Sequence, residues 1–275
     1  MALTAKRRRI SLNACLFIFL WCNMASLQSQ PPRLHAIIIS DVEAPVLGAS
    51  VEQNIQLIKS HTRTIADLIE YKLVVYDFSK ERFHTDTVVS GLAKIHPAPN
   101  DIIWCFYSGH GVNSGRNVWP CMLMPGSKPL CMDGLSALLA VHKPKLLIMQ
   151  ADCCNIGTLT QKNTQLAAMS VAPISGFNAS TNSSAKHLFT AYQGVIKISG
   201  SQVGQSAEYM SYSGGIFTNC FFEQLDKVCQ VQNVNPDVHN WKNFLQDVSK
   251  RTAEVARAFG REQLPQMELL ITRKH

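Results

Sequence analysis

Residues 102–111 read IIWCFYSGHG, an apolar run that stops at a polar tip containing His110. Residues 146–155 read LLIMQADCCN, which repeats the pattern and places Cys153 and Cys154 at the second tip. Short apolar runs bounded by turn residues are typical of strands buried in a parallel sheet. The chain between the runs is long enough for a helical crossover, which would bring both tips to the carboxyl edge of one sheet. Because open α/β sheets place their sites at that edge, the two tips predict a cysteine enzyme.

The rest of the sequence predicts further strands and the helices that cover them. Strands are expected at residues 35–40, 72–78, 194–200 and 267–272, and helices at residues 51–69, 85–95, 132–142, 215–228 and 241–259. Strands and helices alternate through the first half of the chain, which is the order of an α/β fold with a parallel sheet and helices on both faces. Residues 156–186 have no sustained period, so we expect a long exposed loop there.

The bulk composition suits one large domain with no nucleic-acid partner. The chain has 275 residues, 46% of them hydrophobic, which is enough to bury a full core. The formal net charge is +7, and the cluster Lys6–Arg9 supplies four of these charges. No later stripe of Lys and Arg with interleaved aromatic residues is present, so nucleic-acid binding is not expected.

The first 30 residues have the order of an export signal. A basic cluster at residues 6–9 precedes an apolar stretch at residues 10–22, and the small residues Ala25 and Ser26 follow. The apolar stretch is short for a spanning helix, which needs about 20 residues. We expect a signal peptide at residues 1–30 and a secreted or periplasmic domain at residues 31–275. An uncleaved N-terminal membrane anchor and an organelle-targeting peptide are the alternatives.

Seven of the nine cysteines follow residue 30, so at least one of them has no disulfide partner within the chain. Cys121 and Cys131 lie in one loop region and are the plausible disulfide pair in an exported protein. Cys105 lies inside an apolar run and is expected to be a small buried hydrophobic residue. No CxxC or HExxH spacing is present, which argues against metal ligation by the cysteines.

The two tips resemble the sequence boxes of a known enzyme family. Residues 107–111 (YSGHG) and 152–155 (DCCN) resemble the His and Cys boxes of the caspase-like cysteine peptidases, in their metacaspase and bacterial caspase-like branch. Residues 198–208 resemble that family's fifth strand and the turn after it, and residues 214–218 resemble the start of its next helix. The resemblance covers the chain from about residue 34 onward. It implies a caspase-like three-layer sandwich with a mostly parallel six-stranded sheet, and an endopeptidase acting on protein or peptide substrates.

The resemblance also implies which residues would carry the chemistry. The family's second box ends in Asp-x-Cys, which places the nucleophile on Cys154 rather than on Cys153. An imidazole at His110 can activate the thiol or protonate the leaving amine. The N–H groups of Gly111 and Cys154 are expected to bind the oxyanion. Alternation along the strand should send the Cys153 side chain to the opposite face.

Asp152 matches an acidic residue that, in metacaspases, helps to line the pocket for a basic side chain. Asp41, at the end of the first expected strand, is the candidate partner, with an ordinary turn residue as the alternative. A pocket with two carboxylates would favour Arg or Lys before the scissile bond and would repel Asp. Relatives are often cut within the loop at residues 156–186, where Lys162 and Lys186 are the basic residues and hence the processing candidates.

Calcium-dependent metacaspases carry clustered acidic residues in two loops, and this sequence departs from that pattern. Residues 112–124 contain no acid, and the corresponding turn after the fifth strand contains Val203 and Gly204. Calcium prefers several carboxylate or carbonyl oxygens, so we expect no calcium requirement and no other cofactor or metal.

Two interpretations compete with an active peptidase, and the oligomeric state stays open. The first is a catalytically silent caspase-like domain with an interaction or regulatory role. The second is a redox or metal-binding thiol protein that uses the neighbouring Cys153 and Cys154.

Overall fold

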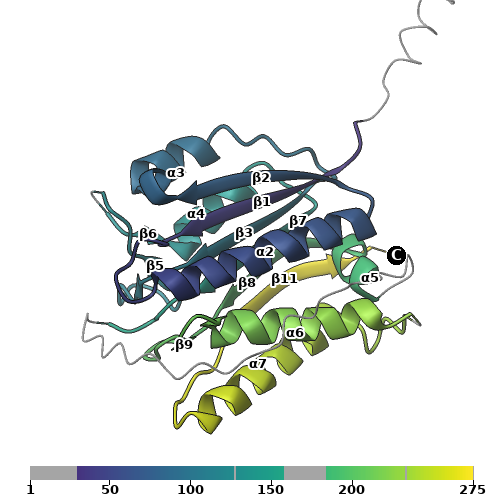
Figure 1. Ribbon diagram of the computed structural model, residues 1–275. Coiled ribbons are helices and arrows are strands. Elements are labelled where there is room, and N and C mark those ends of the chain that lie inside the picture. Colours follow the sequence, from purple (N-terminus) through teal and green to yellow (C-terminus); the bar gives the residue numbers. More distant parts are fainter. Residues whose placement is uncertain (1–29, 127, 158–183, 233, 275) are drawn as a thin grey trace, which may run out of the picture. The chain divides into compact units, whose positions relative to one another are not determined.

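A six-stranded sheet with strand order β11-β8-β7-β3-β1-β2 forms the centre of the computed structural model (Figure 1). Its strands are β1 (Arg33–Ser40), β2 (Lys72–Ser79), β3 (Ile102–Ser108), β7 (Leu146–Asp152), β8 (Tyr192–Ser199) and β11 (Gln266–Arg273). The first five are parallel to one another, and β11 pairs antiparallel with β8 at the edge. The structure describes residues 30–126, 128–157, 184–232 and 234–274, and the domain begins at Pro32.

Helices cover both faces of the sheet. One face carries α2 (Gly48–Leu68), α5 (Ser184–Thr190), α6 (Ile216–Gln230) and α7 (Trp241–Ala258), and the other carries α3 (Thr85–Leu92) and α4 (Met132–Ala140) (Figure 1). A 3-10 turn, η1 (Lys80–Arg82), lies between β2 and α3. A small three-stranded sheet is formed by β4 (Gly111–Val112), β5 (Cys121–Met122) and β6 (Leu130–Cys131), and a hairpin by β9 (Tyr209–Met210) and β10 (Gly214–Gly215).

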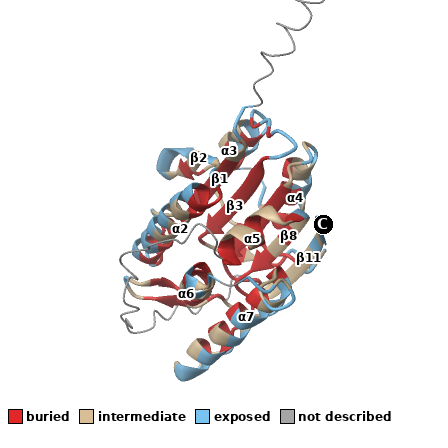
Figure 2. Ribbon diagram, turned by 90° about the vertical axis from the view of Figure 1, so that its right-hand side faces the viewer, coloured by how far each residue is buried: buried red, intermediate tan, exposed pale blue. Residues whose placement is uncertain are grey.

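The two faces of the sheet bury two separate hydrophobic cores. Ile38 contributes to the core under α2, whereas its neighbour Ile39 contributes to the core under α3 and α4. Strand β3 is buried along its whole length (Figure 2). Because every side chain of such a strand meets a covered face, the sequence of β3 is continuously apolar rather than alternating. These features confirm the three-layer α/β sandwich expected from the sequence.

Several element boundaries differ from the sequence-based prediction. Helix α2 begins at Gly48 rather than Val51, so Ser50 lies inside the helix, where its hydroxyl donates to the Met210 carbonyl at 2.9 Å. Helix α5 begins at Ser184, so the loop expected to reach residue 186 ends before that point. The predicted disulfide between Cys121 and Cys131 is present.

Parts of the prediction lie outside the described residues. They include residues 158–183, with the processing candidate Lys162, and residues 1–29 of the expected export signal. Within the described parts of the chain, no helix is long and apolar enough to span a membrane.

The strand register positions the edge where a site is expected. Ser40 of β1 is level with Ser108 of β3, and Ser108 is level with Asp152 of β7. The residues that follow these three positions therefore leave the sheet side by side at its carboxyl edge.

Candidate active site

The His box and the Cys box meet at the carboxyl edge of β3 and β7. The Gly109 N–H donates to the Asp152 carbonyl at 3.3 Å. Gly111 packs so closely on the Cys box that a Cβ there would lie 2.7 Å from the Cys153 Sγ and would collide with the Cys154 carbonyl oxygen. A glycine at position 111 is therefore required for this approach.

His110 lies between these two glycines and is held by its main chain. Its carbonyl accepts hydrogen bonds from the Tyr107 hydroxyl at 2.5 Å and from the Leu123 N–H at 3.0 Å. The first bond comes from the core and the second comes from the loop that follows β5. The structure thus fixes the backbone of His110 next to the Cys box, as the sequence predicts for the two tips.

The two adjacent cysteines have different surroundings. Cys153 is fully buried and belongs to the core under α3 and α4, as strand alternation predicts. Cys154 is 8% exposed, and its Sγ lies 3.9 Å from the Ala207 carbonyl oxygen. Cys153 thus packs in the core under α3 and α4, whereas the Cys154 thiol lies next to Ala207, which belongs to the core under α2.

The Cys154 thiol is held in its protonated form in this arrangement. Burial raises its pKa above the ordinary thiol value, and hydrogen bonds that the sulfur accepts from the Ala207 main chain and the Ser206 side chain partly offset the increase. The negative charges of Glu208 and Asp152 raise the pKa further. A reaction at this thiol therefore needs a base to remove its proton.

Asp152 is fully buried on the face of the sheet that α2 and α6 cover. Its Oδ2 accepts hydrogen bonds from the Thr218 N–H at 3.2 Å, the Thr218 hydroxyl at 2.5 Å and the Asn54 Nδ2 at 3.4 Å. Burial raises the pKa of Asp152 to about 6, against the lowering effect of these hydrogen bonds. Its Oδ1 has no hydrogen-bond partner among the described residues.

Glycines form the walls beside this carboxylate. A Cβ at Gly200 would lie 3.0 Å from the Asp152 Oδ1, and a Cβ at Gly215 would collide with the carboxylate. Asn54 completes the surroundings, because its Nδ2 also donates to the Ser108 hydroxyl at 2.9 Å while its Oδ1 accepts from the Gly215 N–H at 2.9 Å. The structure thus surrounds Asp152 with small residues and amide or hydroxyl donors.

Asp41 follows the end of β1, close enough to His110 for the two charges to interact, and its expected role as the partner of Asp152 stays a prediction. Burial raises the pKa of Asp41, and the charge of His110 lowers it. A Cβ at Gly109 would lie 2.9 Å from both the Asp41 Cβ and the Tyr107 hydroxyl. Tyr107 belongs to the core on the face opposite Asp152, and β3 lies between the strands that end in these two acids.

The remaining predicted site residues are the oxyanion donors and the second processing candidate. Gly111 pairs with Met122 in the small sheet, and the role of the Gly111 and Cys154 N–H groups as oxyanion donors stays a prediction. Lys186 lies in α5, where its Nζ is 3.0 Å from the Glu70 Oε1. A peptidase needs an extended substrate segment, so this helical, ion-paired lysine is the poorer processing candidate.

Sequence reasoning missed Asn54, Ser108 and Thr218 around Asp152. Asn54 and Thr218 lie on helices that are distant from the boxes in sequence, and only packing brings them to the edge. The available signal was that each is a polar residue on an otherwise apolar helix face. Such a residue is normally hydrogen-bonded when it is buried.

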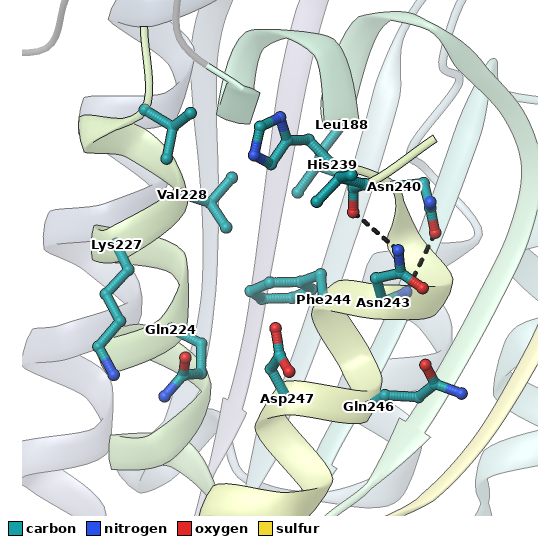
Figure 3. A pocket seen from close by; sticks show the side chains of 12 residues that line it. Leu188, Gln224, Lys227, Val228, His239, Asn240, Asn243, Phe244, Gln246 and Asp247 are labelled. Carbon is teal, nitrogen blue, oxygen red and sulfur yellow. Dashed lines mark hydrogen bonds between the residues drawn. The ribbon is translucent and has the colours of Figure 1, made fainter. Parts of the chain in front are cut away.

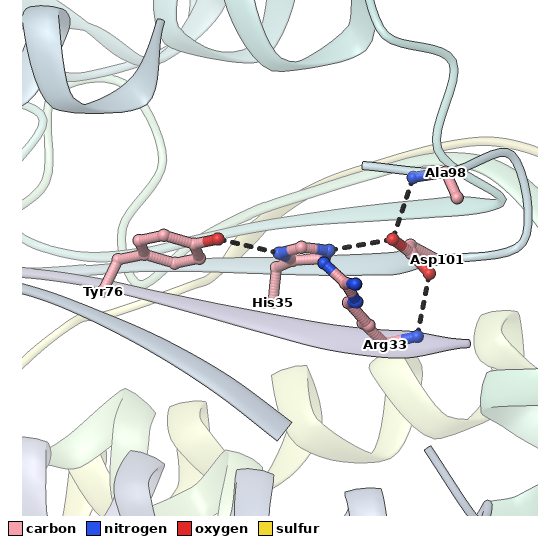
Figure 4. A network of polar contacts seen from close by, with 5 residues as sticks. All are labelled: Arg33, His35, Tyr76, Ala98 and Asp101. Atoms are coloured by element: carbon pink, nitrogen blue, oxygen red, sulfur yellow. Dashed lines mark hydrogen bonds and ion pairs between the residues drawn. The ribbon is translucent and has the colours of Figure 1, made fainter. Parts of the chain in front are cut away.

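Two other polar or hollow features lie away from this edge. A pocket of about 450 Å³ lies between the second half of α6 and the first half of α7, with Leu188, Val228 and Phe244 among its apolar lining (Figure 3). A buried network joins His35 to Asp101 at 2.9 Å and to the Tyr76 hydroxyl at 3.2 Å (Figure 4). This network lies near the starts of β1 and β3, so it anchors the edge opposite the boxes.

Comparison with known proteins gives a family and a fold. The caspase domain model matches residues 59–275, which include both boxes. The fold is similar to that of protein GSU0716 from Geobacter sulfurreducens, with a TM-score of 0.51 and 18% identity over 86% of this chain and 93% of that one. No curated protein matches the chain. Because the caspase domain match spans most of the chain and the fold agrees with it, the chain belongs to the caspase domain family of peptidases.

Proposed function

We propose that the protein is a cysteine endopeptidase of the metacaspase-like branch that cuts peptide bonds after Arg or Lys through Cys154 and His110. The observation that carries the proposal is the Asp152 carboxylate. It lies two residues before Cys154, is fully buried, and has one oxygen without a hydrogen-bond partner among the described residues.

The environment of Cys154 favours a general-base mechanism. Because burial raises the pKa of the thiol, His110 takes its proton as Sγ attacks the substrate carbonyl carbon. The resulting oxyanion accepts hydrogen bonds from the Gly111 and Cys154 N–H groups. The carbon–nitrogen bond then breaks, and His110 returns the proton to the leaving amine. Water, deprotonated by His110, attacks the thioester and releases the acid, which regenerates the Cys154 thiol.

Asp152 supports the preference for a basic residue before the scissile bond. A guanidinium would supply N–H donors to Oδ1 and would stabilise the ionised carboxylate. An acidic side chain would bring a second negative charge into the same buried space and would be rejected. Asp41 stays the candidate second carboxylate of this preference.

Export and processing belong to the same proposal. The disulfide between Cys121 and Cys131 supports an oxidising compartment, because such bonds persist mainly outside the cytosol. We propose secretion or periplasmic export through residues 1–30. We also propose processing at the candidates Lys162 and Lys186, of which Lys162 is the preferred one.

One observation favours a second candidate, the catalytically silent caspase-like domain. Cys154 is only 8% exposed, and its thiol pKa is raised. A domain of this kind would use its surface for binding and would leave the thiol unreactive.

Labelling with a thiol-reactive peptidyl-Arg inhibitor separates the two candidates. The peptidase predicts covalent labelling of Cys154 that is lost in Cys154→Ala and retained in Cys153→Ala, the matched control for a buried neighbouring thiol. Absence of labelling in the wild type and in Cys153→Ala, with both proteins folded, would establish the silent domain.

A further inference from the structure

Asn155 follows Cys154 directly and is fully buried, yet every polar atom it has is hydrogen-bonded. Its Oδ1 accepts from the Asn113 Nδ2 at 2.8 Å, and its Nδ2 donates to the Val118 carbonyl at 2.9 Å and to the Ser201 carbonyl at 3.5 Å. Its N–H donates to the Gln205 carbonyl at 3.0 Å, and its own carbonyl accepts from the Gly204 N–H at 2.8 Å. One side chain and its peptide groups thus reach five other residues.

These partners belong to the two segments that border the Cys box. Asn113 and Val118 lie in the His loop, residues 110–118, which begins at His110. The other partners lie in the β8 turn, residues 200–207, which ends at Ala207. The Ala207 carbonyl contacts the Cys154 Sγ at 3.9 Å. Asn155 is therefore the common hydrogen-bond partner of the segment that carries the imidazole and the segment that faces the thiol.

Asn113 makes the matching contribution from the His loop. Its N–H donates to the Ile156 carbonyl at 2.8 Å, and its Oδ1 accepts from the Gly115 N–H at 2.7 Å. Its Nδ2 donates to the Asn117 carbonyl at 3.2 Å in addition to Asn155. Asn113 thus shapes its own loop and joins that loop to the Cys box by both side-chain and main-chain hydrogen bonds.

The position requires a side-chain amide. Asn155 must accept from one neighbour and donate to two carbonyls, and an amide is the group of this size that does both. Aspartate could accept from Asn113, but its second oxygen would face the carbonyls of Val118 and Ser201 with no proton to share. Alanine would leave the partners of both side-chain atoms unsatisfied in a buried place.

We propose that Asn155, coupled to Asn113, is a positioning residue that sets the placement of His110 relative to the Cys154 thiol. The proposal rests on the proposed peptidase function and deepens it. The His loop is held to the Cys box by Gly111 at its start and by the two asparagines further along, so loss of the amide pair should let this loop shift and change the distance between the imidazole and the thiol. A displacement of about 1 Å between reacting groups lowers a rate by about 100-fold.

The test uses Asn155→Ala, Asn113→Ala, the double variant and Asn155→Asp of the full chain. Gln150→Ala is the matched control, because Gln150 is a buried amide on β7, the strand that precedes the two cysteines, and its Oε1 accepts from the Trp104 Nε1 at 3.0 Å. Two readouts are taken: kcat and KM on a peptidyl-Arg substrate, and the pH profile of Cys154 alkylation by iodoacetamide, followed by peptide mass spectrometry.

We expect each single alanine variant to lower kcat by about 100-fold with KM changed only a few-fold. The double variant should be no worse than either single one, because the two residues act as one unit. Asn155→Asp should be as impaired as Asn155→Ala, whereas Gln150→Ala should keep the wild-type kcat even where its melting temperature falls. If Asn155→Ala does not fold, Asn113→Ala removes the same hydrogen bond from the other side.

The alkylation profile separates this inference from the proposed function, because it needs no peptidase activity. His110→Ala defines how far the wild-type profile depends on the imidazole. The inference holds when Asn155→Ala or Asn113→Ala reproduces the His110→Ala profile, even in a wild type that hydrolyses no peptide. A wild-type profile in both asparagine variants overturns the inference, even in a wild type that is an active peptidase.

Discussion

Thr218 donates both its main-chain N–H, at 3.2 Å, and its hydroxyl, at 2.5 Å, to one oxygen of the Asp152 carboxylate. Thr218 lies in the first turn of α6, where unpaired N–H groups attract negative charge. The pKa of Asp152 nevertheless rises to about 6, so the effect of burial outweighs that of its donors. The carboxylate is therefore poised between its two protonation states in the absence of a basic substrate.

The raised pKa of Asp152 predicts that the free energy of unfolding falls as pH rises. The pKa of Asp152 rises from its ordinary value of 3.8 to about 6, so the folded state favours the protonated form. The protonated carboxyl contributes on the order of 3 kcal/mol to the free energy of unfolding below about pH 4, and this contribution is lost by about pH 6. Denaturant unfolding between pH 4 and pH 7 should show this loss in the wild type but not in Asp152→Asn. Equal pH slopes in the two proteins would contradict the assignment.

Replacing Thr218 should increase the loss of stability that accompanies ionisation of Asp152. Thr218→Val removes the hydroxyl that favours the ionised carboxylate, so the pKa of Asp152 should rise further. We expect a stability loss of about 1.5–3 kcal/mol at pH 7, which shrinks at pH 4, where the carboxyl is protonated. Thr252→Val is the control, because its buried hydroxyl donates to the Val248 carbonyl at 2.8 Å and also contacts the Cys220 thiol, whose pKa is raised to about 12, far above this pH range. The stability loss of Thr252→Val should be the same at pH 4 and pH 7.

A methyl group at Gly111 should separate the two boxes. Gly111→Ala places a Cβ against the Cys153 Sγ and the Cys154 carbonyl, so the His loop must shift. We expect a stability loss of about 1–3 kcal/mol together with loss of peptide hydrolysis. Gly134→Ala in α4 is the control, because a Cβ there meets nothing within 4 Å. It should keep full activity, and an active Gly111→Ala protein would contradict the close approach.

The buried network at the opposite edge should affect stability without affecting chemistry. Asp101→Ala removes the acceptor of the His35 ring and of the Arg33 and Ala98 N–H groups, so we expect a loss of about 3–5 kcal/mol. Activity per folded molecule should be unchanged. Asp77→Ala, which breaks a partly exposed pair with Lys59, should cost about 0–1 kcal/mol. A change in KM or kcat in folded Asp101→Ala would show that this network reaches the site.

The sequence predicts the sheet edge well because each strand there carries its own signal. The continuously apolar runs of β3 and β7 can be satisfied only by burial on both faces, and their polar tips must then emerge together. The choice of Cys154 over Cys153 comes from the resemblance to the family's Asp-x-Cys box. The burial of Cys153 in the core under α3 and α4 agrees with the direction that alternation predicts for its side chain.

The pocket residues could not be predicted in the same way, because they depend on the spatial order of the strands. The strand that precedes Asp41 and the strand that ends in Asp152 lie on either side of β3, an order that the sequence does not state. Asn54 and Thr218 reach Asp152 because α2 and α6 pack on one face of the sheet, and the hydrophobic pattern of those helices predicts burial but no partner. The contacts of Asn54 and Thr218 with Asp152 are therefore set by tertiary packing, which the sequence pattern does not reveal.

The central claim, hydrolysis by Cys154 after a basic residue, is tested most directly with a positional scanning peptide library. The wild type and Cys153→Ala should cleave after Arg and Lys, Cys154→Ala should show no cleavage, and Asp152→Asn should lose the basic preference. Full hydrolysis by Cys154→Ala, or a wild type that cuts preferentially after Asp, would contradict the account.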